Sequence, residues 1–521
     1  MSRLESALGI FTDPRHFKVR LLVEGLIIGV FTGLVISAFR FLLQLSEVAL
    51  PRLYAFLAQE PQYVPLWMMV LAAIGYIIYR LVACDGMISG SGIPQIKGIL
   101  AGQMNMNWAR VLVLKFTGAV LGIGAGMSLG REGPSVQLGA CLGQGLGRLT
   151  HRSYAEDHYL LTAGAGAGLA AAFNAPLAGV IFCLEELTKD FSPYVLLGAI
   201  SASVMATTVT QLVFGMEPVF HMGVVPVVPT GGLYGLLIAM GIFVGVLGLG
   251  FNKMLTRSLD AYRDAPLPAW AKPMVPLAGA LVLGFVLPQV LGGGSTLVDS
   301  LVYTRYTLLF LLVLLAGKFF FTMLCFGSGV PGGIFLPMLV LGAIGGAVFA
   351  RVAVLTGCMG SEWVVDCIVF GMAAYFAAVV KSPVTGSILI MEMTGSFEHM
   401  LALITVSMTA YVVADLAGSE PVYDMLLNRS LAQQQRLATR ARHHRIMLEL
   451  LVSRGSRIDG AAIADVSWPA GSLIVDVRRG TEEIAPSGDV RLQHGDYLYV
   501  LTEADTEPEL QRLAAERQPQ A

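Results

Sequence analysis

Long apolar stretches with few charges recur along most of the chain. The first covers about residues 21–39 and the second about residues 67–84, and each is long enough to cross a bilayer as a helix. Further apolar segments lie near residues 111–129, 159–187, 194–216, 232–252, 273–291, 307–326, 333–356, 363–380, 383–394 and 400–417. Several of these are too short, or too rich in Gly and Pro, to cross unaided. The pattern predicts an all-α polytopic membrane protein with broken helices, and broken backbone at membrane depth points to a site.

The apolar region also repeats itself. Pro383 lies 207 positions after Pro176, and Glu392 lies the same distance after Glu185. Further matches at this offset pair Gly164 with Gly371, Leu169 with Phe376, Ala170 with Ala377, Ala171 with Ala378, and Gly179 with Gly386. Self-similarity of this kind indicates two related halves. The copies cover about residues 100–215 and 305–417, within expected halves at 21–216 and 232–430.

The composition changes after residue 417. Residues 431–445 are polar and rich in Gln and Arg, which predicts a linker helix. Three short apolar runs bounded by turn sequences predict strands, at 447–452, 472–477 and 497–501. A terminal helix is expected from about Glu507. We therefore predict a small α+β domain at 446–514, followed by a tail at 515–521 and preceded by a membrane domain at 21–430.

Composition excludes several classes of protein. The 521 residues are 55% hydrophobic and only 13% charged, with a mean hydropathy of +0.69, which is too apolar for an ordinary soluble enzyme of this length. The net charge of −2 gives no basic field for nucleic acid. The six cysteines show no C-x-x-C spacing and are interpreted as buried neutral thiols: Cys84, Cys141, Cys183, Cys325, Cys358 and Cys367. We expect no metal or other cofactor.

Positive charges gather on both sides of the apolar region. Before it stand Arg3, Arg15, Lys18 and Arg20, and after it stand Arg429, Arg436, Arg440, Arg442 and Arg445. The positive-inside rule then places both termini in the cytoplasm, which requires an even number of crossings. Residues 1–20 show no signal-peptide pattern and are expected to form a cytoplasmic N-terminal segment.

Residues 128–137 hold an acid and a base inside an apolar tract. Arg131 and Glu132 are framed by glycines and by Pro134. A charge at bilayer depth costs about 2.5 to 3.5 kcal/mol on insertion scales, so such a carboxylate lines a cavity, pairs, or changes protonation. Glycine permits a tight turn and proline suits the first turn of a helix, whose free N–H groups attract anions. The stretch indicates an anion site that contains an acid, with a structural Arg131–Glu132 pair as the alternative.

Three other features point the same way. Ser91, between Gly90 and Pro94, offers a hydroxyl at an expected helix start, although a tight turn explains the sequence equally. Residues 329–337 could present the amides of Ile334 and Phe335 to an anion, or could form a packing kink. Tyr423 is a lone hydroxyl near the end of the membrane region and is alternatively an interfacial anchor.

Glu185 and Glu186 end an apolar run, so they are expected near a membrane face. One could be a solvated helix end. The other could accept protons from the cytoplasm and pass them inward to Glu132. Neutral donors and helix N-termini suit a small monovalent anion, because a full Lys or Arg ligand would hold it too tightly to release.

Together these residues resemble the CLC family of chloride channels and anion/proton antiporters over about residues 20–430. The family's motifs G-S-G-I-P, G-R-E-G-P and G-x-F-x-P stand here at 90–94, 130–134 and 333–337. The resemblance implies a fold of two inverted-topology repeats with broken and tilted helices. It implies anion binding by Ser91, Gly92, Ile93, Ile334, Phe335 and Tyr423. It gives structural roles to Gly90, Pro94, Gly130, Arg131, Gly133, Pro134, Gly333 and Pro337.

The resemblance also implies a function. Glu132 would be the external gating glutamate, which competes with the anion and moves away when protonated, and Glu186 the internal proton-transfer glutamate. A chloride/proton antiporter in a bacterial inner membrane, working as a homodimer with one pathway per subunit, is expected. Ser91, where other members carry proline, is similar to the chloride-preferring version. A passive voltage- or pH-gated chloride channel is the alternative, and a membrane-embedded enzyme lacks any supporting motif.

Two features depart from the family's bacterial exchangers. Gln95 and Lys97 stand where those members carry acids, which leaves the local charge pairing, including that of Lys115, open. The tail does not resemble the paired CBS module of many eukaryotic members. It resembles the C-terminal subdomain of TrkA/RCK-type regulators, which implies dimerisation and an unidentified small ligand.

Overall fold

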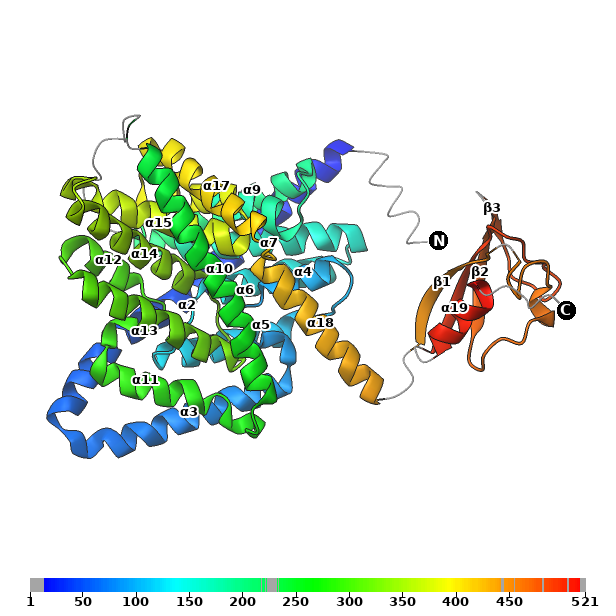
Figure 1. The fold of residues 1–521 in the computed structure, drawn as a ribbon, viewed down its shortest axis with the longest axis horizontal. Coiled ribbons are helices and arrows are strands. Elements are labelled where there is room, and N and C mark those ends of the chain that lie inside the picture. The colour runs from blue at the N-terminus through cyan, green and yellow to red at the C-terminus, as the bar shows by residue number, and fades with distance from the viewer. Residues whose placement is uncertain are drawn as a thin grey trace. The chain divides into compact units, whose positions relative to one another are not determined.

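The protein forms two compact units, with the boundary between Leu427 and Asn428. A computed structural model describes residues 14–216, 218–220, 222, 232, 234–441, 445–453, 455–479, 482–503 and 506–515 (Figure 1). Most of the expected segments 1–20 and 515–521 lie outside these residues. The expected linker at 431–445 lies mostly within helix α18, Val422–Ala441, which begins before the boundary and continues past it.

The larger unit is built of helices. They are α2 (Pro14–Gln59), α3 (Val64–Cys84), α4 (Ile93–Leu100), α5 (Trp108–Gly124), α6 (Glu132–Leu149), α7 (Tyr154–Phe173), α8 (Pro176–Phe182), α9 (Pro193–Phe214), α10 (Tyr234–Asp264), α11 (Met274–Val286), α12 (Ser295–Tyr303), α13 (Leu308–Gly327), α14 (Phe335–Leu355), α15 (Val364–Val380), α16 (Pro383–Thr394), α17 (Met400–Leu416) and α18. Short turns of 3-10 helix join several of them, and a π-helical turn, η3 (Cys183–Leu187), extends α8.

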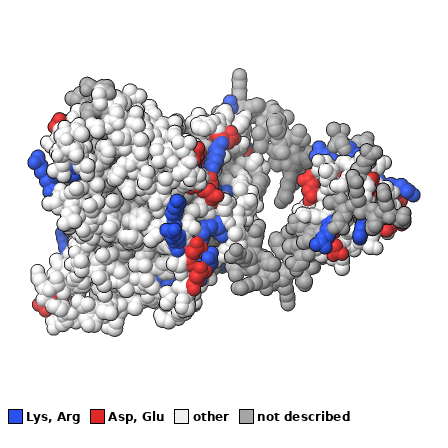
Figure 2. Space-filling model, viewed as in Figure 1, with Lys and Arg blue, Asp and Glu red and all other residues white. Residues whose placement is uncertain are grey.

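The surface of this unit suits a bilayer. Nine helical stretches of the described chain are long and apolar enough to cross a membrane. Large apolar side chains face outward, such as Phe31 and Phe41 on α2, and charged side chains are sparse on the face of the helical unit in Figure 2. The predicted polytopic membrane protein with broken helices is confirmed.

The first span is longer than the sequence pattern predicted. Helix α2 has 46 residues, against the 19 expected at 21–39. At 1.5 Å per residue it is about 69 Å long, roughly twice the thickness of a hydrocarbon core, so it extends beyond that core or tilts strongly within it. The expected span ended at Phe39, but the helix continues past Arg40, whose guanidinium lies over the ring of Phe214 and donates to the carbonyl of Ala171.

The two halves are inverted copies that meet at a pair of glycines. Gly130 and Gly333 form an antiparallel bridge, in which the amide of each donates to the carbonyl of the other at 2.6 and 2.8 Å. Each half also holds one buried lysine in the same way. Lys115 donates to the carbonyl of Gly90 at 2.6 Å, and Lys318 donates to the carbonyl of Gly292 at 2.7 Å. Lys115 is therefore bound to backbone carbonyls.

The repeated glutamates cap each other's half. Glu185 accepts from the amide of Thr385 at 2.6 Å, in the first turn of α16. Glu392 accepts from the amide of Ala178 at 2.7 Å, in the first turn of α8. A carboxylate satisfies helix N–H groups that have no partner within the helix, and it is favoured by the helix dipole. This exchange of caps stabilises the contact between the halves at two symmetric points.

The smaller unit is a four-stranded antiparallel sheet with a helix, α19 (Glu507–Ala515). The strands are β1 (Arg445–Leu451), β2 (Leu473–Arg479), β3 (Glu482–Ile484) and β4 (Tyr497–Glu503), in the order β1-β4-β2-β3. Three of them agree with the predicted strands to within two residues at each end. The prediction missed β3, because three residues beginning Glu-Glu give no apolar signal. The hydrophobic core of the smaller unit includes Leu450, Val477, Leu498 and Leu510.

A buried ion pair closes the edge of this core. Asp496, which is fully buried, accepts two 2.8 Å hydrogen bonds from the Arg479 guanidinium and one from the amide of Gln493. Burial alone would raise the pKa of Asp496, but these hydrogen bonds outweigh it and hold the pKa below its usual range. The carboxylate therefore stabilises the unit above the ordinary Asp pKa of about 3.9, and this contribution is lost as the pH falls through the lower native pKa.

We expect Asp496→Asn to destabilise the smaller unit by about 1–2 kcal/mol at pH 7, because it removes charged hydrogen bonds to a partly exposed arginine. Hydrogen exchange of the intact protein measures this as faster exchange of β1, β2 and β4, with the membrane helices unchanged. The variant should also be less sensitive to acid than the wild type. Asp489→Asn, at an exposed turn, is the control. Equal exchange in both variants would contradict the assignment.

Candidate functional site

Three Gly/Pro breaks far apart in the sequence meet at one buried place. The bridge between Gly130 and Gly333 joins two of them. The third break, at residues 90–94, contacts this pair because its Gly90 carbonyl accepts a hydrogen bond from the amide of Gly332 at 2.9 Å. Gly133 lies against Ser91 so closely that any side chain at Gly133 would overlap its backbone and hydroxyl. The three motifs identified in the sequence therefore form one site.

Each break turns the chain into a helix. Gly92 is the N-cap of α4 with φ +98°, which glycine adopts without strain, and Ile93 follows as the first helical residue. Helix α6 begins at Glu132 and α14 begins at Phe335. Each first turn contains a proline, which tolerates that position because its missing N–H would have no helical partner: Pro94, Pro134 and Pro337. Three helix N-termini thus start beside one another.

Two hydroxyls at this site have no hydrogen-bond partner among the described residues. Ser91 is 2% exposed and Tyr423 is 0% exposed, and neither side-chain oxygen has a hydrogen-bond partner within the described part of the chain. Leaving a buried hydroxyl unpaired costs about 1–3 kcal/mol. Both hydroxyls are therefore available to donate to a ligand. The alternative of Tyr423 as an interfacial anchor is wrong, because the side chain is fully buried.

Phe335 closes the site with its ring while its backbone starts α14. The ring packs between Phe173 and Phe376, with centroid distances of 5.4 and 4.7 Å. Ile334 is the N-cap of α14, and both side chains are fully buried. The first N–H groups of this helix have no partner within it. Helix-start amides within an apolar wall are suited to binding an anion.

The carboxylate of Glu132 lies against the start of α14. The side chain is fully buried, and its Oε2 accepts a hydrogen bond from the amide of Leu336 at 3.3 Å. Its Oε1 has no hydrogen-bond partner among the described residues, and the guanidinium Nε of Arg131 lies 3.8 Å away. The contact with Arg131 is long and is not a hydrogen bond. The Arg131–Glu132 pair is therefore weaker than the sequence suggested, and the helix start holds the carboxylate.

Glu186 is buried, and both oxygens of its carboxylate are hydrogen-bonded. Its Oε1 accepts from Lys97 Nζ at 2.7 Å, and its Oε2 accepts from the hydroxyl of Ser382 at 2.8 Å. Both Glu186 and Glu132 lie within electrostatic range of the Tyr423 hydroxyl. Neither acid of the Glu185-Glu186 pair is a freely solvated helix end, because Glu185 caps α16.

Sequence reasoning missed the partners of these acids. Lys97 bonds Glu186 and also pairs with Asp424, which answers the open question of its charge partner. Gln95 donates to the carbonyl of Ser89 at 2.9 Å. The only available signal for Lys97 was its place three residues after Pro94, on the same short helix as the anion motif.

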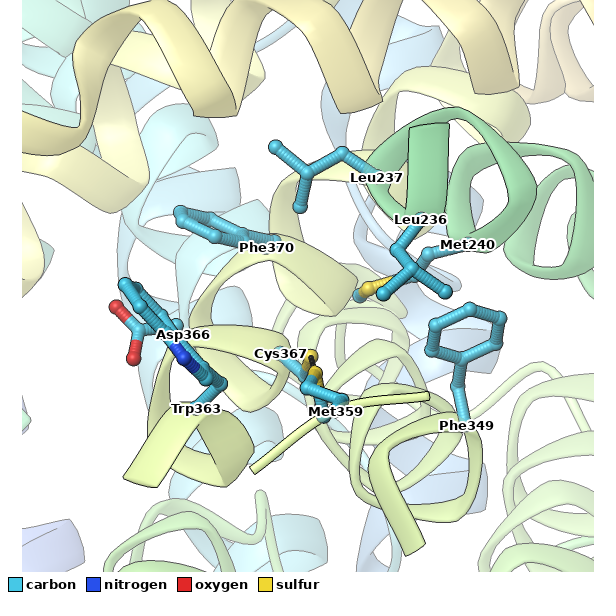
Figure 3. Close-up of a pocket in the computed structure, with 9 residues that line it drawn as sticks. All are labelled: Leu236, Leu237, Met240, Phe349, Met359, Trp363, Asp366, Cys367 and Phe370. Atoms are coloured by element: carbon cyan, nitrogen blue, oxygen red, sulfur yellow. Dashed lines mark hydrogen bonds between the residues drawn. The ribbon is translucent and has the colours of Figure 1, made fainter. Parts of the chain in front are cut away.

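An apolar pocket elsewhere in the unit is a separate feature. It lies beside α10, α14 and α15, and Figure 3 shows the rings of Phe349, Trp363 and Phe370 around it. None of the residues of the site lines it. Four of the six cysteines are buried, but the expectation is wrong for Cys84 and Cys358, which are exposed. Within the described ranges no group of three His, Cys, Asp or Glu side chains could hold a metal ion.

Two family models match the chain. The model described as voltage gated chloride channel matches residues 69–415, and the TrkA-C domain model matches residues 447–515. The H(+)/Cl(-) exchange transporter ClcA of Vibrio cholerae serotype O1 is 36% identical over 446 residues, which cover 81% of this chain and 92% of the relative. The resemblance therefore extends over nearly the whole length of that relative.

Solved structures show the same fold. A slow cyanobacterial Cl−/H+ antiporter superposes with a TM-score of 0.75 at 32% identity, covering 80% of this chain and 99% of that one. A CLC-type fluoride/proton antiporter superposes with a TM-score of 0.64 at 25% identity, covering 76% and 95%.

We expect Tyr423→Phe and Ser91→Ala each to weaken anion binding by about 10-fold or more, because each removes one hydrogen bond to a charged ligand. Isothermal titration of the purified protein with chloride measures the change. Tyr54→Phe is the matched control, since its hydroxyl already donates to the carbonyl of Ala280. Unchanged affinity in both site variants would show that these hydroxyls serve another purpose.

Proposed function

The chain belongs to the CLC family of voltage gated chloride channels, and on that premise we propose that it is a chloride/proton antiporter. It exchanges small monovalent anions for protons across the membrane. The observation that carries the proposal is that the Glu132 carboxylate accepts a hydrogen bond from an amide at the N-terminus of α14. The same site holds the hydroxyls of Ser91 and Tyr423, which have no hydrogen-bond partner among the described residues. The proteins that the chain resembles include ones named as H(+)/Cl(-) exchangers.

The proposed anion site uses only neutral donors. Ser91 and Tyr423 donate through their hydroxyls, and Ile334 and Phe335 through backbone amides at the start of α14. Gly92 and Ile93 add the start of α4. Hydroxyls, amides and helix dipoles attract a small anion without binding it irreversibly. Serine at position 91 favours chloride in this account.

Glu132 is the proposed external gate. When ionised, its carboxylate competes with the anion, because both are drawn to the same helix N-terminus. Protonation removes the charge and makes the carboxyl a poorer acceptor for the Leu336 amide. The side chain can then leave and an anion can take its place. One carboxylate thus exchanges a proton for an anion at a single point.

Glu186 is the proposed internal proton acceptor. It is nearly as deeply buried as Glu132, and the Tyr423 hydroxyl lies within electrostatic range of both. Protons would enter from the cytoplasm at Glu186 and continue to Glu132, while anions use the route past Ser91. The positive charges on both sides of the membrane domain favour cytoplasmic termini, and we place the protein in a bacterial inner membrane.

The rest of the chain has proposed roles as well. Two subunits form a homodimer, each with its own pathway through the membrane domain at 21–430. Residues 446–514 form a regulatory domain that binds an unidentified small ligand. If anions moved without protons, the protein would instead be a passive chloride channel of the same fold.

Glu132→Gln should abolish proton transport and leave anion flux, because glutamine keeps the shape of the side chain but neither carries nor releases a proton. We expect proton flux to fall by about 100-fold or more. Simultaneous chloride and proton fluxes in liposomes measure both effects. Glu392→Gln is the control, since its carboxylate caps α8 and lies outside the pathway. Proton coupling that survived in Glu132→Gln would rule out this gate.

Glu186→Gln should stop proton transport alone, with a similar loss of about 100-fold. The neighbouring carboxylate provides a matched control: Glu185→Gln alters a helix cap and should keep its coupling. The same liposome assay measures both variants. Intact coupling in Glu186→Gln would mean that protons reach Glu132 by another route.

A further inference from the structure

Lys97 and Asp424 connect the buried Glu186 to the protein surface. We propose that they form a proton relay that loads Glu186 from the solvent, an inference that rests on the proposed proton/anion exchange. Lys97 lies on α4 and Asp424 on α18, next to Tyr423. The two relay residues therefore lie on helices that also contribute to the proposed anion site.

A continuous line of contacts carries the proposal. Lys97 Nζ donates to Glu186 Oε1 at 2.7 Å and also pairs with Asp424 Oδ1. The other oxygen of Asp424, Oδ2, accepts from Lys189 Nζ at 2.5 Å. One ammonium group thus bridges two carboxylates that belong to different helices. Such a group passes a proton without any large movement of its side chain.

Burial falls steadily along this line. The side-chain exposures are 2% for Glu186, 7% for Lys97, 27% for Asp424 and 54% for Lys189. Burying charged groups is costly, and ion pairs in an interior are a poor source of stability compared with apolar side chains of similar size. A graded series from solvent to a proton acceptor is the arrangement that proton transfer needs.

The transfer balances in three steps. The Lys97 ammonium gives a proton to the Glu186 carboxylate, which leaves a neutral amine and a carboxylic acid. Asp424, protonated by solvent, then gives its proton to the Lys97 amine and becomes a carboxylate again. The net result is one proton moved from solvent to Glu186, with Lys97 and Asp424 unchanged.

The other groups around Glu186 are occupied differently. Ser382 donates to Glu186 Oε2 and holds the carboxylate in place, and Glu185 is bound to the start of α16. Lys189 faces Asp424 from the exposed side. Glu132 lies within electrostatic range of Tyr423, which is not in the relay. Lys97 is the group that contacts both Glu186 and Asp424.

The competing explanation is purely positional. Because Lys97 and Asp424 tie α4 to α18, their pairing could simply hold Ser91 and Tyr423 in place. Arginine separates the two roles. A guanidinium keeps the positive charge and the ion pairs, but it does not release a proton in proteins, whereas a lysine ammonium can.

The test compares variants reconstituted in liposomes, with chloride and proton fluxes measured together. Lys97→Arg and Lys97→Met should each keep chloride flux and lower proton flux by at least about 10-fold. Asp424→Asn should lower proton flux to a similar extent. Lys381→Met is the matched control, because it breaks another lysine–aspartate pair, with Asp415, and should leave the proton-to-chloride ratio unchanged.

Each outcome is decisive. If Lys97→Arg retains the wild-type proton-to-chloride ratio while Lys97→Met loses it, the pair is positional and the relay is overturned. If Lys97→Arg loses chloride flux as well, Asp424→Asn decides, and normal coupling in it overturns the relay. If the wild type moves chloride without protons, the proposed exchange fails and the relay with it. Coupled wild type with uncoupled Lys97 variants supports both.

Discussion

The start of α14 is the point on which the whole account depends. Its first amides need a negative partner, because helix N–H groups there have none within the helix and the helix dipole adds a partial positive charge. In this structure the Glu132 carboxylate is that partner, because it accepts a hydrogen bond from the amide of Leu336. The antiparallel bridge between Gly130 and Gly333 makes the contact possible, since it sets the two helix starts side by side. Any substitution that separated these glycines would separate the acid from the amide.

The inverted repeat explains both the stability of this arrangement and its chemistry. Both halves share a scaffold of a lysine bound to carbonyls and a glutamate that caps the opposite half. The site itself is asymmetric. Helix α6 begins with Glu132, whereas its counterpart α14 begins with Phe335, so one half supplies the acid and the other supplies an apolar wall with free amides. Symmetry therefore builds the frame, and the differences between the copies make the site.

Much of this arrangement was predictable from local sequence. Glycine and proline predicted helix starts near Gly92, Glu132 and Phe335. Short apolar runs bounded by turn sequences predicted three of the four strands of the smaller unit. The partners of Lys97 were not predictable, because they come from segments about 90 and 330 positions away. The reciprocal caps left a trace in the repeat, where Glu185 and Glu392 align, but their targets depend on how the halves pack. The length of α2 was also missed, since the contacts of Arg40 are tertiary.

The central claim is that one buried carboxylate exchanges a proton for an anion. The most direct measurement is proton movement by the wild-type protein in liposomes that hold a chloride gradient and no initial pH gradient. In an antiporter, chloride that moves down its gradient drives protons in the opposite direction, so we expect a pH difference to build up across the membrane. Chloride flux that leaves the internal pH unchanged, with the membrane potential clamped, would contradict it.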